Sequence, residues 1–281
     1  MIQKPEWMKI RYIDTPNREA VEKMLESLNL NTVCREANCP NYMECFSRKT
    51  ATFMILGTNC TRDCRFCNVT YGEPKSLDCD EPTNVAVAVK KLELKYVVIT
   101  SVTRDDLPDG GAEHFAKTIE AIKEMSPETA IEVLVPDFGG DINSLKVIAD
   151  AKPTVISHNM ETIKSLYTEV RPQAEYERSL NLLKNIKNLN SNIHSKSGIM
   201  VGLGETEEQV YELFDDLIKV KCEFLTIGQY LAPTKNHVQI KEYIEPSMFE
   251  KYKSAALEKG FNFVASAPFV RSSYNAGEAI E

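Results

Sequence analysis

The sequence predicts an α/β fold in which helices cover a parallel sheet. From residue 51 onward, short apolar runs typical of buried strands alternate with longer amphipathic runs typical of helices. This alternation repeats about six times, and such strand–helix–strand units join parallel strands through right-handed crossovers. Both an open, doubly wound sheet and a curved, partial version of the TIM barrel are compatible with it.

The predicted elements follow in order along the chain. A short helix is expected over residues 17–28, with Thr15 as its N-cap and Pro16 at its first position. Strand-like runs lie at residues 51–57, 96–102, 131–136, 154–159, 197–203 and 224–231. Helical runs lie near residues 84–92, 112–125, 142–149, 162–188 and 205–219. Reactive groups gather on the loops after the strands of such sheets, so the active site is expected after the first strand.

Composition and charge disfavour several classes of protein. With 43% hydrophobic residues, 12 Gly and 13 Pro among 281 residues, the chain has neither a disordered nor a fibrous composition. The 33 Lys and Arg against 41 Asp and Glu give a net charge of -8, which disfavours a nucleic-acid partner because phosphate binding relies on a basic surface. The first residues lack the apolar core of a signal peptide, and no apolar run is long enough to span a bilayer. We therefore expect a cytoplasmic protein without a membrane partner.

Six of the eight cysteines crowd into one stretch, as two triplets. In a reducing compartment such thiols bind metal rather than form disulfides. The second triplet, Cys60, Cys64 and Cys67, has the spacing Cys-x3-Cys-x2-Cys, which lets one loop hold three corners of a cubane and leaves one iron open. Zinc and a closed electron-transfer cluster are the alternatives, but both would take four ligands. The pattern therefore predicts an open, catalytic cluster.

The first triplet, Cys34, Cys39 and Cys45, has the spacing Cys-x4-Cys-x5-Cys and precedes the first predicted strand. It supplies a second set of three thiolates, and so predicts a second cluster with a task of its own. Together the two triplets resemble those of the lipoyl synthases, a family of the radical SAM superfamily. The resemblance runs along nearly the whole chain, through residues 4–7, 35–41, 50–57, 201–206, 228–231 and 271–274.

The resemblance implies a fold, a reaction and partners. The fold would be a partial (β/α)6 TIM-like barrel over residues 51–260, with the auxiliary-cluster cysteines in residues 1–50 and a segment closing that cluster in residues 261–281. A radical from S-adenosylmethionine (SAM), generated at the second triplet, would allow insertion of two sulfur atoms at C6 and C8 of an octanoyl chain on a lysine of a lipoyl carrier protein. The auxiliary 4Fe-4S cluster would be the sacrificial sulfur donor. A low-potential electron donor such as ferredoxin or flavodoxin and an iron-sulfur cluster delivery protein are implied partners.

The same resemblance assigns residues to SAM. Gly110 and Gly111 are expected to offer backbone groups to the methionyl amine, although a glycine turn before the next helix is equally compatible with the sequence. Gly202 and Gly204 are expected to let the backbone approach the adenine. Arg178 is the candidate for the carboxylate of SAM, with Arg171 in reserve, and a solvated arginine is the plain alternative for each.

A fourth ligand of the auxiliary cluster is expected from the C-terminal run Arg-Ser-Ser-Tyr at residues 271–274. This run is similar to the family's motif in which a serine oxygen binds that cluster, and we prefer Ser273 to Ser272. A hard alkoxide beside soft thiolates would be the easier ligand to release during catalysis. Two alternatives remain open, another radical SAM sulfur-inserting enzyme and a non-catalytic iron-sulfur carrier, and only the carrier would form no 5′-deoxyadenosine.

Overall fold

The parallel sheet begins at β2 (Thr52–Ile55), whose four residues are all buried. Strands of a parallel sheet are covered on both faces and therefore form unbroken apolar runs. The computed structural model describes residues 3–10 and 15–280, and it joins β2 to six further parallel strands. These are β5 (Tyr96–Ser101), β6 (Ala130–Leu134), β7 (Val155–Ser157), β8 (His194–Val201), β9 (Phe224–Gln229) and β10 (Phe263–Ser266).

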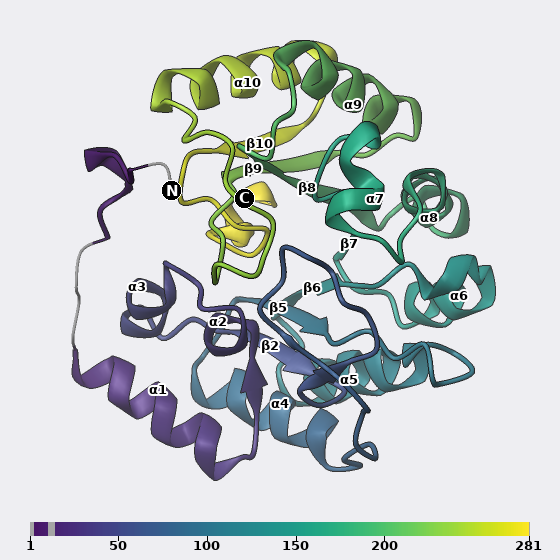
Figure 1. The fold of residues 1–281 in the computed structure, drawn as a ribbon. Helices are drawn as coiled ribbons and strands as arrows, with labels where there is room; N and C mark the ends of the chain where they lie inside the picture. The colour runs from purple at the N-terminus through teal and green to yellow at the C-terminus, as the bar shows by residue number, and fades with distance from the viewer. Residues whose placement is uncertain (1–2, 11–14, 281) are drawn as a thin grey trace.

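The strands lie side by side in the order of the chain, from β2 to β10. A doubly wound sheet would instead reverse its strand order at a switch point. Figure 1 shows that the strands follow a curve with the helices outside it, which is the arrangement of a partial TIM-like barrel. The fold predicted from the sequence and the family resemblance is therefore confirmed.

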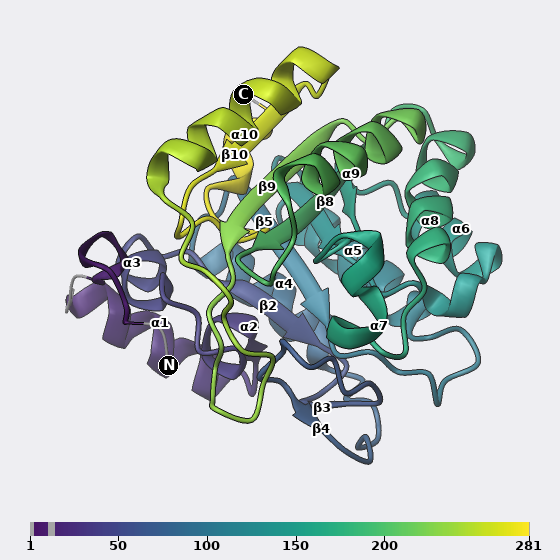
Figure 2. The ribbon, with the colours of Figure 1, turned by 45° about the horizontal axis from the view of Figure 1, so that its top comes forward.

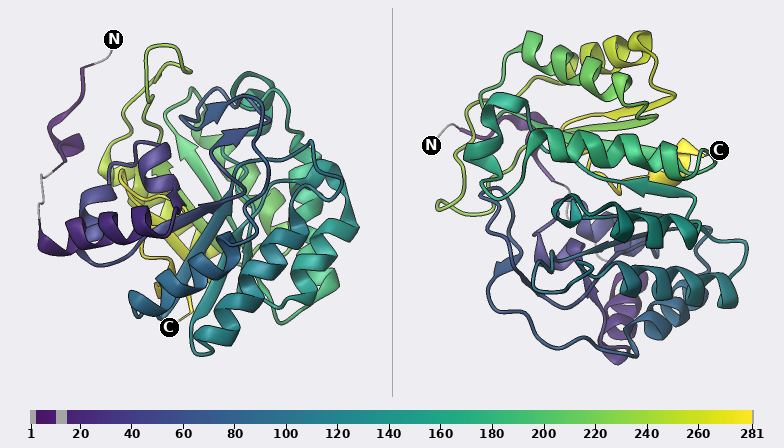
Figure 3. Two further views of the ribbon diagram at one scale, coloured as in Figure 1. Left: turned by 90° about the horizontal axis from the view of Figure 1, so that it is seen from below. Right: turned by 90° about the vertical axis from the view of Figure 1, so that its right-hand side faces the viewer.

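Six longer helices, one after each parallel strand from β2 to β9, follow in the chain, and they cover the outer face of the sheet (Figures 1 and 3). They are α4 (Glu81–Lys91), α5 (Ala112–Met125), α6 (Ile142–Asp150), α8 (Tyr176–Leu189), α9 (Glu207–Lys219) and α10 (Pro246–Lys259), and a short α7 (Tyr167–Val170) precedes α8. The five predicted helical runs correspond to helices α4 to α9. Helix α10 and strand β10 were not predicted, and β10 extends the main sheet beyond residue 260, where the predicted barrel segment ends.

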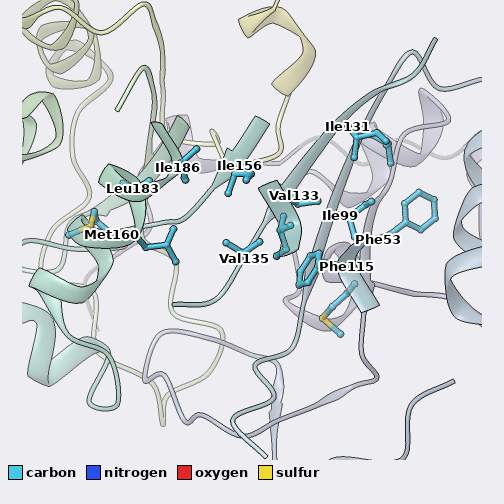
Figure 4. Packing of buried hydrophobic residues seen from close by; sticks show 14 of the residues in the cluster. Phe53, Ile99, Phe115, Ile131, Val133, Val135, Ile156, Met160, Leu183 and Ile186 are labelled. Carbon is cyan, nitrogen blue, oxygen red and sulfur yellow. The ribbon is translucent and has the colours of Figure 1, made fainter. Parts of the chain in front are cut away.

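The main core lies between the sheet and these helices. Its apolar side chains belong to one connected cluster of buried residues. Figure 4 shows part of it, including Phe53, Ile99 and Val133 from the strands and Phe115 and Leu183 from the helices, all almost fully buried. Since burial of apolar surface is the main force that stabilises a fold, this core fixes the positions of the strand ends that carry the site.

The N-terminal region packs on the edge of the barrel. Helix α1 (Pro16–Ser27) begins as predicted, because the side chain of Thr15 accepts a hydrogen bond from the backbone of the first turn. A short strand, β1 (Asn31–Thr32), then pairs antiparallel with β2. It leads into α2 (Val33–Glu36) and α3 (Tyr42–Ser47), which carry two cysteines of the first triplet. Residues 11–14 of the N-terminal stretch lie outside the described residues.

The second triplet lies in a loop beside a small separate sheet. This sheet consists of β3 (Asn59–Cys60) and β4 (Thr70–Tyr71), and Figure 2 shows it apart from the main sheet. The two strands bracket the loop of residues 60–67, so that both of its ends are hydrogen-bonded. Within the described ranges, no helix has the length and apolar character needed to cross a bilayer.

Candidate functional site

A cavity of about 480 Å³ opens among the C-terminal ends of the strands. This volume is typical of sites for small molecules. Five of the six clustered cysteines line it, namely Cys34, Cys39, Cys60, Cys64 and Cys67. Two stretches that are separate in sequence, before and after strand β2, therefore present their thiols to one space.

The loop of the second triplet is arranged to hold thiolates. The sulfur of Cys60 accepts two backbone hydrogen bonds, from Arg62 N at 3.4 Å and from Thr103 N at 3.3 Å. Burial raises the pKa of Cys67 to about 12, and the neighbouring charges of Cys64 and Cys60 also raise it. The three sulfurs thus lie close enough to repel one another as thiolates. A bound metal cluster would remove this penalty by taking the place of the thiol protons.

Arg62 fixes this loop from within. Its Nε and Nη2 donate hydrogen bonds of 2.7 and 2.8 Å to the carboxylate of Asp105, which follows β5. Nη2 also donates a 2.6 Å hydrogen bond to Asp137, which follows β6. Although burial opposes the charge, Arg62 holds the pKa of Asp137 down to about 2. These contacts of Arg62 were not predicted from the sequence, and the position of both acids just after predicted strands was the available signal.

The thiols of the first triplet also lie close together. Burial, followed by the charge of Cys39, raises the pKa of Cys34 to about 11. Burial, followed by the charges of Cys34 and Cys39, raises the pKa of Cys45 to about 12. Cys45 does not line the cavity itself, but its thiol lies close enough to Cys34 and Cys39 for their charges to raise its pKa. The first triplet is therefore a second, separate set of converging thiols.

The C-terminal segment lies against the first triplet. Asn41, between Cys39 and Cys45, donates a 2.7 Å hydrogen bond to the carbonyl of Phe269. Tyr274 donates a 3.1 Å hydrogen bond to Glu44 in helix α3. These two contacts bring residues 271–273, which line the cavity, next to cysteines more than two hundred positions earlier in the chain.

The two serines of this segment differ in their contacts. Ser272 Oγ accepts a 2.7 Å hydrogen bond from the side-chain amide of Asn159. Ser273 also lines the cavity, but its side chain makes no hydrogen bond with any other residue that the structure describes. Ser273 is therefore the serine whose oxygen is available to a ligand.

Of the two candidate arginines, Arg171 lines the cavity and Arg178 does not. Arg171 is buried, and its Nη1 donates to Tyr167 and to two backbone carbonyls, while its Nε has no partner among the described residues. Arg178 instead pairs with Asp137 and Glu175 and lines a different cavity of about 270 Å³. An unpaired, buried edge of a guanidinium suits a carboxylate ligand.

The four predicted glycines are found in turns beside the strand ends rather than in the cavity lining. Gly111 (φ +91°) precedes α5, and a Cβ there would stand 2.4 Å from the side chain of Leu56. Gly202 (φ +96°) follows β8, and a Cβ there would stand 2.4 Å from a backbone oxygen. Gly110 and Gly204 also have positive φ angles. The conformation of these turns accounts for glycine at each position, and their role toward SAM stays a prediction.

The donor set fits two iron-sulfur clusters better than single metal ions. Among residues 3–10 and 15–280, no three His, Cys, Asp or Glu side chains converge closely enough to hold one ion. A cubane needs no such convergence, because each thiolate binds a different iron. Three free thiols per site, and two backbone N–H groups that donate to the sulfur of Cys60, are features that suit such a cluster.

Comparison with known proteins gives the family. The radical SAM superfamily model matches residues 54–217. The chain is 57% identical to the lipoyl synthase of Alkaliphilus metalliredigens over 279 residues, which covers 99% of this chain and 96% of that protein. It is 55% identical to the lipoyl synthase of Caldicellulosiruptor saccharolyticus over 276 residues, with 98% and 97% covered.

Solved structures of lower identity share the fold. Streptococcus suis SuiB bound to S-adenosylmethionine matches with a TM-score of 0.59 and 14% identity, over 91% of this chain and 57% of that chain. Methylornithine synthase matches with a TM-score of 0.55 and 13% identity, over 93% of this chain and 81% of that chain. Both similarities extend over nine tenths of the chain, and at such identities they concern the fold alone.

Proposed function

Because this chain belongs to the lipoyl synthase family of the radical SAM superfamily, we propose that its two cysteine triplets hold two 4Fe-4S clusters around one cavity. The chain is a radical SAM sulfurtransferase. It inserts two sulfur atoms, at C6 and C8, into an octanoyl chain on a lysine of a lipoyl carrier protein. Those carbons are unactivated, so acid–base chemistry by side chains is not enough to remove their hydrogens.

The two clusters, when bound, supply a 5′-deoxyadenosyl radical by reductive cleavage of SAM and the sulfur that is inserted. Cys60, Cys64 and Cys67 hold the first cluster, in a loop that Arg62 fixes in advance. Cys34, Cys39 and Cys45 hold the auxiliary cluster, and Ser273 completes its coordination. The contact between residues 271–273 and the first triplet supports this assignment of the serine.

Arg171 takes the carboxylate of SAM in this proposal, in place of the preferred candidate Arg178. Its buried Nε lacks a partner among the described residues and its side chain lines the cavity. Arg178, by contrast, already forms ion pairs with Asp137 and Glu175. Gly110, Gly111, Gly202 and Gly204 act through the turns that they permit, which set the backbone around the SAM site.

The partners follow from the reaction. The octanoylated lipoyl carrier is the substrate. A low-potential donor such as ferredoxin or flavodoxin supplies the electrons for SAM cleavage, and a cluster delivery protein rebuilds the auxiliary cluster after its sulfur is used. We place the enzyme in the cytoplasm, because thiol ligands and exposed iron-sulfur clusters need a reducing compartment.

One observation carries the proposal: thiols of both triplets and the C-terminal serines line the same cavity. The test is anaerobic reconstitution with iron and sulfide, followed by addition of SAM, reductant and an octanoylated carrier peptide. We expect 5′-deoxyadenosine together with a peptide that has gained two sulfur atoms, measured by mass spectrometry. A plain cluster carrier would form no 5′-deoxyadenosine. A sulfur inserter with another substrate would form it without changing the peptide.

A further inference from the structure

The C-terminal segment is seated on the barrel by close backbone contacts. On one side, the side-chain amide of Asn41 holds the carbonyl of Phe269 at 2.7 Å. On the other side the segment presses on β9, where a Cβ at Gly228 would stand 2.1 Å from the carbonyl oxygen of Val270. No residue larger than glycine leaves room for this contact. The path of the chain toward the two serines is therefore fixed from both sides.

Within this seat, Ser272 is held by Asn159, which follows β7. The amide nitrogen of Asn159 donates to Ser272 Oγ at 2.7 Å and to the carboxylate of Glu161 at 3.0 Å. Both amide hydrogens of Asn159 are therefore used in these two contacts. Asn159 is 9% exposed, so little water competes for its hydrogen bonds.

Gly198 in strand β8 makes room for this contact. A Cβ at Gly198 would stand 2.8 Å from Asn159 Oδ1, 2.9 Å from Ser272 Oγ and 2.6 Å from Thr226 Oγ1. All three distances are shorter than side chains tolerate. The convergence of Asn159 and Ser272 therefore depends on the absence of a side chain at position 198.

We propose that Asn159 and Ser272 form a latch that positions the neighbouring Ser273 for the auxiliary cluster. Ser272 Oγ accepts the hydrogen bond from Asn159, whereas Ser273 lines the cavity without a hydrogen-bond partner among the described residues. Ser272 and Asn159 are thus positioning residues, and the proposal rests on the function proposed above. Since Asn159 belongs to the strand end that also carries Glu161, the latch joins the serine pair directly to the barrel.

The test measures hydrogen exchange of the C-terminal segment in the iron-free protein and the rate of iron loss from the auxiliary cluster. In the iron-free protein, Asn159→Ala and Ser272→Ala should each increase hydrogen exchange of residues 268–276. A second set of measurements uses a chain in which Cys60, Cys64 and Cys67 are replaced by Ala, so that it holds the auxiliary cluster alone. There each variant should speed the loss of iron to a chelator about three- to tenfold, the factor that one hydrogen bond of ordinary strength corresponds to.

The double variant Asn159→Ala/Ser272→Ala should be no faster than either single variant, because both remove the same bond. Gly198→Ala should have the same effect while leaving both partners in place. The Mössbauer spectrum of the auxiliary cluster should keep the signature of a non-thiolate ligand in these variants and lose it in Ser273→Ala.

Two outcomes would overturn the latch. One is additive effects of the two single variants. The other is a spectrum of Ser272→Ala that matches Ser273→Ala while Asn159→Ala behaves like the unaltered chain, since Ser272 would then be the ligand itself. Failure of the proposed function can be distinguished from failure of the latch. In that case the chain without Cys60, Cys64 and Cys67 would bind no auxiliary cluster, even with Asn159 and Ser272 unchanged.

Discussion

The Nη2 atom of Arg62, a residue that lines the cysteine cavity, lies 2.6 Å from Oδ1 of Asp137. The side chain of Asp137 is fully buried, and that of Arg62 is 6% exposed. Arg62 belongs to the loop between Cys60 and Cys64, whereas Asp137 follows strand β6. This ion pair therefore ties the loop of the second triplet to the barrel by a contact that needs no metal.

Replacing Arg62 by Gln should destabilise the iron-free protein by about 3 kcal/mol, because the buried Asp137 loses its closest ion-pair partner and keeps only the longer contact with Arg178. Denaturant unfolding followed by circular dichroism measures this change. Asp105→Asn is the matched control, because Asp105 contacts the same guanidinium but its side chain is 42% exposed. Its cost should be about 1 kcal/mol or less. Equal costs for the two variants would contradict the role given to the buried pair.

Variants of the two triplets should separate SAM cleavage from sulfur insertion. Cys64→Ala should abolish the formation of 5′-deoxyadenosine, because the cluster that cleaves SAM loses a ligand. Cys39→Ala should retain some SAM cleavage while losing all sulfur insertion. Chromatography of the nucleoside products and mass spectrometry of the carrier peptide measure the two activities. Lipoyl product from Cys39→Ala, or normal 5′-deoxyadenosine from Cys64→Ala, would refute the assignment of that triplet.

Ser273→Cys should keep the auxiliary cluster and SAM cleavage but depress sulfur insertion. A thiolate is a softer and stronger ligand for iron than an alkoxide, so that corner of the cluster should be harder to open. Ser273→Ala should make the cluster more labile. The yield of lipoyl product per chain and the spectrum of the auxiliary cluster are the measurements. Unaltered yields and spectra in both variants would exclude Ser273 as a ligand.

Arg171 and Arg178 form a matched pair for SAM binding. Arg171→Gln should weaken SAM binding about 10- to 100-fold, since hydrogen bonds between charged groups contribute about 1.5–3 kcal/mol. Arg178→Gln should leave the affinity nearly unchanged, because its charge is used by Asp137 and Glu175. Calorimetric titration of the reconstituted protein with SAM measures both. The reverse result would return the role to Arg178.

The stability of the protein should fall between about pH 6.5 and pH 4, because His158 is buried in its neutral form. Burial, and then the charge of Arg171, lowers the pKa of His158 from 6.5 to about 4. Its Nδ1 donates to the carbonyl of Val135, and its Nε2 accepts from Ser179. The unfolded chain binds more protons in this range, so the stabilising contribution is complete above pH 6.5 and is lost as the pH falls.

This loss should amount to about 3 kcal/mol of unfolding free energy for the whole shift. His158→Gln cannot titrate, and it should flatten the pH dependence between pH 6.5 and 4 even if it lowers stability overall. Denaturant unfolding at a series of pH values measures the slope. An equally steep slope in the variant would show that another group is responsible.

Much of the barrel was predictable, because parallel strands such as β5 form continuous apolar runs that differ from amphipathic helices. The last helix and strand of the barrel, α10 and β10, were not predictable in this way. Helix α10 buries only Phe249, Tyr252 and Ala256 among its apolar residues. Strand β10 lies at the edge of the sheet and is half-buried. A weak apolar face and a short edge strand carry little periodic signal, so these elements became visible only with the sheet assembled.

The cysteine spacing was enough to predict the chemistry of this protein, because the three thiols of each triplet come from one short stretch of the chain. Which partners surround those thiols became known from the folded structure alone. Arg171 rather than Arg178 lines the cavity, Asp137 holds Arg62, and Asn159 holds Ser272. Such contacts join residues far apart in the chain, and they exist because neighbouring parallel strands end at the same edge of the sheet. No local spacing encodes that proximity.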